Sequence, residues 1–203
     1  MSSSSASTIR DRYPTERVTI ASGQPWKETN KKMREVLKAD SWKPGFPFGE
    51  PVPPHPLAKD LDMESFARLV RKRLGPYELM LFDQFPHYFQ IPMYLEKDPR
   101  SLPRTITYVI GNPLIALTML QHDYNSGLHV PFRLAINEEA DGSSSVTYVL
   151  PSSQIAIGQW ADSDPKREKA LRDAAVALDA KVEAMVRFAT GTVAEEESVE
   201  ARL

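Results

Sequence analysis

The segment between residues 106 and 151 constrains the fold of this chain most strongly, because its strand signals are separated by turns of definite type. The apolar run ITYVI ends at a Gly-Asn-Pro turn. Asn112 can cap a helix there, and Pro113 suits the first helical position. The pattern therefore predicts a strand over residues 106–110 and a short helix ending near Gln121.

A hairpin is predicted after this helix. Residues 128–136 alternate apolar and polar side chains, as expected for a strand with one buried face. Pro131 within that run cannot donate a hydrogen bond to a neighbouring strand, so it indicates a sheet edge or a bulge. The pair Asp141-Gly142 then favours a tight turn into a last strand over residues 145–150.

Two more strands and three more helices complete the predicted fold. Residues 17–22 alternate in polarity, whereas residues 77–85 are apolar on both faces and resemble an interior strand. The helices are predicted over residues 25–39, 62–74 and 165–190. Antiparallel strands with helices on one face and a long C-terminal helix give an α+β two-layer sandwich with about five strands.

Capping residues mark the ends of these helices. Asp62 and Asp164 each precede an apolar periodic run, and an aspartate at that position can accept a hydrogen bond from the first free amides. Gly191 follows the last apolar position of the long C-terminal helix and predicts its end.

The rest of the chain is predicted to be tails and insertions around one domain. Residues 1–14 are rich in serine and residues 192–203 are acidic, so both are predicted to be disordered. Between them, residues 15–191 form a single α+β domain. Residues 41–75 insert a proline-rich arm and a helix, and residues 86–105, with four more prolines, are predicted to be a long loop.

The arm over residues 41–59 is too apolar for a plain linker. Its proline density excludes a helix and favours an extended backbone. Trp42, Phe46 and Phe48 lie within it and should be mostly buried. Three alternatives stay open: an arm packed on its own domain, a lid over a ligand site, and an arm exchanged in a dimer.

Composition excludes several classes of protein. The chain has no cysteine, so disulfides, thiolate metal sites and cysteine nucleophiles are excluded. A net charge of −2 and a pI near 6.1 argue against a nucleic-acid partner. The mean hydropathy is −0.38, and neither a membrane span nor a secretory signal is visible, so a cytoplasmic location is expected.

Several turn and strand residues occur at spacings that resemble the family known as domain of unknown function 302. They are Gly111, Asn112, Pro113, Gly127, Leu128, Pro131, Arg133, Gly142, Tyr148 and Pro151, with Asp83 at the end of the preceding strand. This resemblance implies the TATA-binding-protein-like α+β fold group and a homodimer. Some folds of that group bind small molecules between the sheet and the long helix. The insertions described above have no counterpart in the compact family pattern.

Candidate chemistry is limited to acid–base groups. The four histidines lack the spacing of a metal site, and no phosphate-binding loop or Gly-x-Ser-x-Gly elbow occurs, so neither a metal nor a cofactor is predicted. Asp83 is an even number of residues from Leu79 and Leu81, so in a regular strand it faces the same side as they do. Its carboxylate would then lie in an apolar layer, where it is poorly solvated. His87 follows four residues later. These two residues are the candidate catalytic pair.

Five residues are candidate substrate ligands. Arg133 and His129 lie on the same predicted strand face and could bind a carboxylate or a carbonyl oxygen. Tyr108 and Tyr148 offer phenol donors near strand ends, and Trp42 could close the site. Each also has a purely structural interpretation: an ion pair between Asp83 and Arg133, a dimer contact, or packing at the edge of the core.

Two functional hypotheses follow and stay open. In the first, the protein binds a small molecule between the sheet and the long helix and acts as a cofactor-independent isomerase, cyclase or lyase. Its substrate would be a small apolar or aromatic carbonyl compound, and Asp83 and His87 would be the acid–base pair. In the second, it is a non-catalytic homodimeric binding or scaffolding module that associates through its arm and an open sheet face. A cavity of at least about 300 Å³ between sheet and helix would favour the first.

Overall fold

The fold is built on one antiparallel sheet, and the computed structural model describes residues 8, 10, 12–41 and 62–192. The strands run in the order β1-β5-β4-β3-β2, and every neighbouring pair is antiparallel. This confirms the predicted single antiparallel sheet. The strands are β1 (Arg17–Ser22), β2 (Met80–Phe85), β3 (Thr105–Gly111), β4 (Phe132–Glu138) and β5 (Ser144–Val149).

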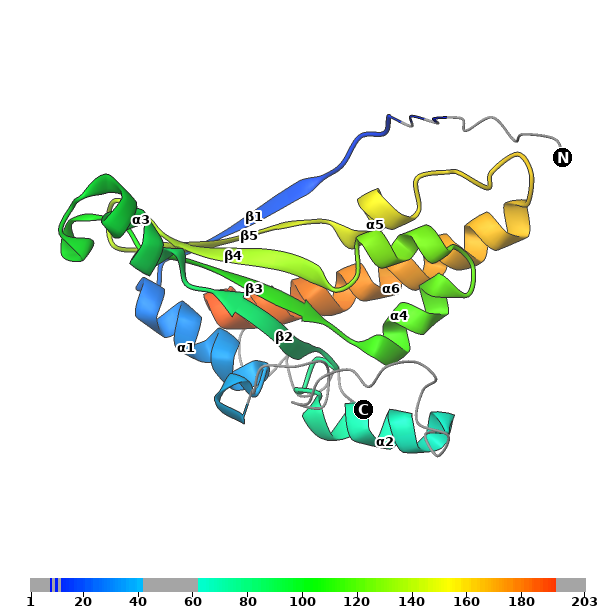
Figure 1. Ribbon diagram of the computed structural model, residues 1–203, viewed down its shortest axis with the longest axis horizontal. Helices are drawn as coiled ribbons and strands as arrows, with labels where there is room; N and C mark the ends of the chain where they lie inside the picture. The colour runs from blue at the N-terminus through cyan, green and yellow to red at the C-terminus, as the bar shows by residue number, and fades with distance from the viewer. Residues whose placement is uncertain (1–7, 9, 11, 42–61, 193–203) are drawn as a thin grey trace, which may run out of the picture.

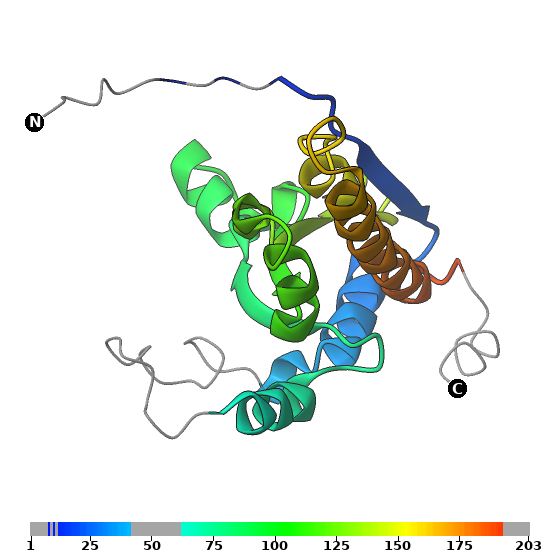
Figure 2. The same cartoon turned by 90° about the vertical axis from the view of Figure 1, so that its right-hand side faces the viewer.

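Two helices cover one face of the sheet and the others lie around its ends (Figure 1). α1 and α6 contact each other beneath the strands, and the end-on view shows them on the same side (Figure 2). α3 lies at one end of the strands, and α4 lies at the other (Figure 1). The helices are α1 (Trp26–Val36), α2 (Met63–Arg73), α3 (His87–Leu95), α4 (Pro113–Leu120), α5 (Pro151–Ile155) and α6 (Pro165–Thr190), with 3-10 turns η1 (Ala39–Ser41), η2 (Pro99–Ser101) and η3 (Tyr124–Leu128).

The hydrophobic core lies between the sheet and these two helices. Alternate residues of the three central strands point into it, as period-two side-chain alternation requires. α6 contributes an apolar stripe that repeats at helical spacing and faces the sheet. Fully buried members of this core include Tyr108, Ile110, Leu134, Ile136, Val146, Leu178, Val182 and Met185. The α+β two-layer sandwich expected from the sequence is therefore the observed fold.

The predicted helix ends are confirmed because they depend on local chemistry. The side chains of Asp62, Asn112 and Asp164 accept hydrogen bonds from amides in the first turns of α2, α4 and α6. Gly191 ends α6 with a φ of 71°, a left-handed conformation that glycine adopts without steric cost.

Four local predictions were wrong. β2 begins at Met80 and lies at an edge of the sheet, whereas an interior strand from residue 77 was predicted. Residues 86–105 are not one loop, because α3 forms there with Pro92 inside it. α5 was not predicted at all. β4 begins at Phe132 rather than at residue 128, since residues 124–128 form η3 and a cis peptide bond precedes Pro131.

Some of the sequence predictions fall on parts of the chain that the structure does not describe. Trp42, Phe46 and Phe48 of the proline-rich arm lie outside the described residues, and so do residues 1–7 and 193–203 of the two tails. Among the described residues, no helix combines the length and the apolar character needed to cross a membrane.

Candidate functional site

The face of the sheet turned away from α1 and α6 is lined by small, β-branched and charged side chains. One cross-strand row on this uncovered face runs from Phe85 through Thr107, Ala135 and Thr147 to Thr19. The hydroxyls of Thr19 and Thr147 lie 3.0 Å apart, which shows that both side chains share this face. The row is accessible to solvent at both ends and half-buried in the middle.

Asp83 lies on this uncovered face, not in the core as its strand parity predicted. The register of β2 shifts between Leu81 and Asp83, so Phe82 is an extra residue in the strand. Leu81 pairs with Ile110 on the core side, and Asp83 pairs with Val109 on the opposite side. A β-bulge of this kind reverses the facing of every residue beyond it. The expected burial of the Asp83 carboxylate among apolar side chains was therefore wrong.

Arg133 occupies the same cross-strand row as Asp83. Val109 pairs with Asp83 on one side and with Arg133 on the other. Two strand spacings separate the two Cα atoms, which corresponds to about 10 Å. No ion pair joins these side chains in the described part of the chain. The Asp83 carboxylate accepts a hydrogen bond from the amide of Gln84 at 2.8 Å, and Arg133 is exposed.

His87 completes this group on the neighbouring row. It is the first residue of α3, and its Nε2 lies 3.2 Å from the hydroxyl of Thr107. Its ring also stacks on Phe85, with 6.5 Å between the ring centroids. The structure thus brings Asp83, His87 and Arg133 to one surface. That surface is the uncovered side of the sheet, not the layer between sheet and long helix.

The two tyrosines lie on the opposite, core side of the sheet. The hydroxyl of Tyr108 donates a hydrogen bond to Asn30 Oδ1 at 2.8 Å. Burial raises the pKa of Tyr108, and burial raises the pKa of Tyr148 to about 12. Neither phenol can therefore lose its proton readily near neutral pH, and neither shares a surface with Asp83.

The last two candidates are separate from this group. His129 ends η3 just before β4, half-buried and 3.5 Å from the hydroxyl of Tyr13. Burial lowers the pKa of His129, which favours its neutral form. Trp42 lies outside the described residues.

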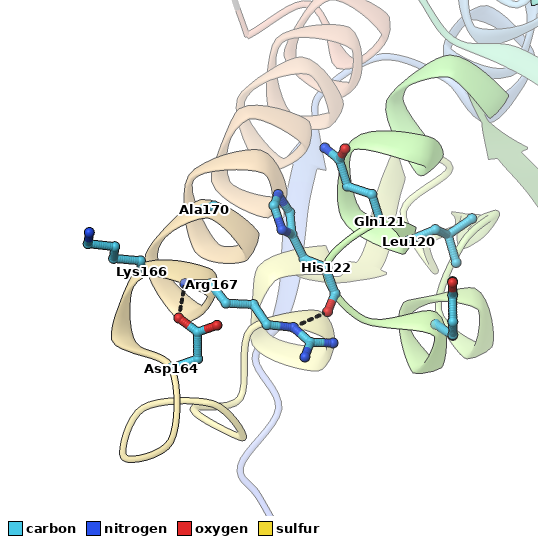
Figure 3. A pocket seen from close by; sticks show the side chains of 8 residues that line it. Leu120, Gln121, His122, Asp164, Lys166, Arg167 and Ala170 are labelled. Carbon is cyan, nitrogen blue, oxygen red and sulfur yellow. Dashed lines mark hydrogen bonds between the residues drawn. The ribbon is translucent and has the colours of Figure 1, made fainter.

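A pocket occurs at a different place from the one expected. The layer between the sheet and α6 is filled by core side chains that are 0–2% exposed. A surface pocket of about 620 Å³ opens instead where the end of α4 and η3 meet the first turns of α6 (Figure 3). In the described ranges, no group of three or more His, Asp or Glu side chains could hold a metal ion.

Neither this pocket nor one more surface feature was predicted from the sequence. Nearly all residues of α3 are apolar or aromatic, and five of them are 40–88% exposed. The mostly apolar run HYFQIPMYL could have indicated this exposed helix, but its proline favoured the prediction of a loop. The five exposed residues, called the α3 patch below, are Phe89, Ile91, Met93, Tyr94 and Leu95.

The comparisons with known proteins agree with the observed architecture. The family model described as "Domain of unknown function DUF302" matches residues 56–185, which is more than half of the 203-residue chain. The chain belongs to the DUF302 family. A DUF302 structure, the crystal structure of an uncharacterized conserved protein from Bacillus stearothermophilus, is 14% identical and has a TM-score of 0.52. That alignment covers 85% of this chain and 97% of the other, and it supports the fold. No curated protein matches the chain.

The DUF302 motif residues have structural roles here. A Cβ on Gly111 would lie 3.2 Å from Pro131 Cβ and 3.4 Å from the Phe82 ring, so a larger side chain would push the bulge outward. Asn112 caps α4 and also donates a hydrogen bond to the carbonyl of Glu78 at 2.8 Å. These contacts hold β2, β3 and β4 in the register that sets the rows on the uncovered face.

Proposed function

We propose that this DUF302 chain is a homodimeric binding module that associates through the uncovered face of its sheet together with α3. One observation carries the proposal: the α3 patch exposes five large apolar side chains beside a sheet face that none of the described helices covers. Several exposed large apolar side chains on one short helix favour a contact with another molecule. His87 connects the two regions, because it begins α3 and contacts Thr107 on the sheet.

The size of the surface supports a combined interface. A five-stranded face of six residues per strand measures about 20 Å on each side, or on the order of 400 Å². A stable interface takes about 800 Å² from each partner, so the sheet face alone is too small. Adding α3 extends this face at one end of the strands with further apolar surface.

Charge complementarity favours a second copy as the partner. Asp83 lies on the edge strand β2, and Arg17 lies at the other edge in the same row, paired with Val149. If two such faces pack with a two-fold axis along β4, Asp83 at the edge of each copy meets Arg17 of the other, whereas the two copies of Arg133 face each other across the axis. An isologous contact of this kind is the common way for a chain to dimerise.

Substituting the α3 patch tests this proposal. Met93 and Tyr94 are 78% and 88% exposed, so replacing both with lysine should leave the monomer folded. In the doubly substituted protein the dimer dissociation constant is expected to rise about a hundredfold or more, because two apolar contacts buried in the proposed interface are lost. Sedimentation equilibrium over a range of protein concentrations measures this constant.

Val176→Lys provides the matched control. Val176 is a 52% exposed apolar residue on α6, outside the α3 patch, and the same change there should leave the dissociation constant unaltered. A wild-type protein that sediments as a monomer at every concentration, or equal effects of the two changes, would contradict the proposal.

Acid–base chemistry on the same face is the second candidate function. It is favoured by the shared placement of Asp83, His87 and Arg133. In this alternative Asp83 takes a proton from a carbon next to the carbonyl of a small apolar or aromatic compound, with His87 as proton partner. Arg133 binds the carbonyl oxygen and stabilises its developing negative charge. The reaction would be an isomerisation, cyclisation or elimination without a cofactor.

Proton exchange into a simple ketone tests this candidate without knowledge of the substrate. If Asp83 is the base, the protein should accelerate deuterium incorporation into cyclohexanone in D2O, followed by proton NMR. Asp83→Asn is expected to lower the protein-dependent rate about a hundredfold, the usual contribution of a positioned base. Asp173→Asn, at an exposed position on α6, is the control. Equal rates for wild type and Asp83→Asn would show that the carboxylate is not the base.

A further inference from the structure

The start of α6, where the pocket opens, lies at the end of the molecule opposite α3 (Figure 1). Leu120 lies on one side of it, and the first turns of α6 form the other (Figure 3). Tyr124 also lines the pocket. Its volume of about 620 Å³ falls in the range that holds small organic ligands. Because it is remote from the α3 patch, a dimer formed through that patch would leave this pocket accessible.

Arg167 is held in one orientation at this pocket. Its guanidinium stacks over the Trp160 ring, with 3.5 Å between Cζ and the ring centroid. Its Nε donates a hydrogen bond to the carbonyl oxygen of His122 (Figure 3). No described residue accepts a hydrogen bond from its two terminal nitrogens. The guanidinium is therefore fixed on one edge and has two parallel donors left, the geometry that binds a carboxylate in a bidentate manner.

The other charged groups at the pocket leave a positive balance. Lys166 adds a second positive charge, and Asp164 adds a negative one. The Asp164 carboxylate accepts the amide hydrogen of Arg167 at 3.1 Å, so it caps α6 and occupies the amide that an anion could otherwise use. An anion at this site must therefore be bound by the Arg167 side chain, and not by the helix end. His122 and Tyr124 are the remaining titratable groups that line the pocket.

The opposite side of the pocket selects for apolar material. Tyr124 is 86% exposed and offers an aromatic ring to a bound molecule, and Leu120 also lines the pocket. A ligand with an acid group at one end and a hydrocarbon or aryl body at the other would satisfy both sides together. Inorganic anions would satisfy only the charged side.

We propose that this pocket binds a small organic carboxylate, with its carboxylate on the free edge of Arg167 and its apolar body against Leu120 and Tyr124. The site is separate from the dimer surface and from the Asp83 group, so ligand binding here does not depend on the function proposed above. The ligand class follows from an oriented guanidinium and an exposed aromatic ring on facing sides of one pocket.

Calorimetric titration with three probes tests this proposal on the full-length protein. Benzoate carries both the charge and the apolar body, benzamide removes the charge, and inorganic phosphate removes the apolar body. Benzoate is expected to bind at least about tenfold more tightly than either of the others, as expected when a charge-assisted pair and an apolar contact act together. Arg167→Gln should weaken benzoate binding about tenfold or more.

Two further variants keep the test decisive if Arg167→Gln disturbs the fold. Tyr124→Ala removes an exposed ring that contributes little to the packing of the protein. It should weaken benzoate binding several-fold and leave phosphate binding unchanged. Lys169→Gln removes a charge from the same helix outside the pocket and should change nothing. Equal binding of benzoate and benzamide, an unaffected folded Arg167→Gln protein, or no binding of benzoate at millimolar concentration would each overturn the proposal.

Discussion

Replacing Gly75 with alanine is expected to destabilise the protein by about 3 kcal/mol or more, among the largest effects of any single methyl group here. Gly75 lies between α2 and β2, where its amide donates a hydrogen bond to the carbonyl of Leu79 at 2.9 Å. A Cβ on it would lie 1.7 Å from the carbonyl oxygen of Val36. The Val36 oxygen is a backbone atom and the position of a Cβ is fixed by its own backbone, so no side-chain rotation can relieve the clash.

Thermal unfolding measures this effect, with a second glycine as the control. For a chain of this length, 3 kcal/mol corresponds to a fall in Tm of roughly 6–12 °C. A Cβ on Gly23 would meet no atom within 4 Å, so Gly23→Ala should leave Tm unchanged or raise it slightly. If the two variants melted at the same temperature, α2 and the end of α1 would not be packed as closely as described.

Truncating Tyr108 should be about as damaging, for a different reason. Its side chain is 0% exposed and lies on the core face of β3. Tyr108→Ala is expected to lower the free energy of unfolding by about 3–5 kcal/mol, because a large aromatic contact is replaced by a cavity. Urea denaturation gives this value directly.

The conservative change Tyr108→Phe separates packing from hydrogen bonding. It keeps the ring and removes only the bond to Asn30, so the expected loss is about 1 kcal/mol. If Tyr108→Phe lowered the free energy of unfolding as much as Tyr108→Ala, the hydroxyl and not the ring would supply most of the stabilisation. A folded Tyr108→Phe protein is also expected to keep any activity of the uncovered face, because this residue points the other way.

The elements that could be predicted from sequence are those determined by local chemistry. Asn112, Asp164 and Gly191 mark helix ends because each satisfies backbone groups within its own turn. The alternation in β4 likewise predicted which of its side chains point to the core, since period-two facing requires only a regular strand. These signals were enough for the fold class and for the DUF302 resemblance.

The candidate site was harder to predict because it depends on one irregularity in β2. The run MLFDQF contains no glycine or proline that would mark a bulge at Phe82. The bulge is fixed by tertiary contacts, with the Phe82 ring beside Gly111 and Pro131. Counting residues along a regular strand therefore assigned Asp83 to the wrong face, although the sequence pattern had grouped Asp83 with His87 and Arg133. The prolines over residues 86–105 likewise led to the wrong prediction of a loop, because Pro92 is accommodated inside a short helix.

The strand order has a consequence for how this chain folds. β2, β3, β4 and β5 are neighbours both along the chain and in space, so they can assemble in sequence from contacts closed by fairly short segments. β1 is made first, but it pairs only with β5, more than a hundred residues later. Bringing such distant segments together is slow because the loop entropy must be lost before any contact is gained. During synthesis, β1 and α1 must therefore wait unpaired until nearly the whole domain has emerged.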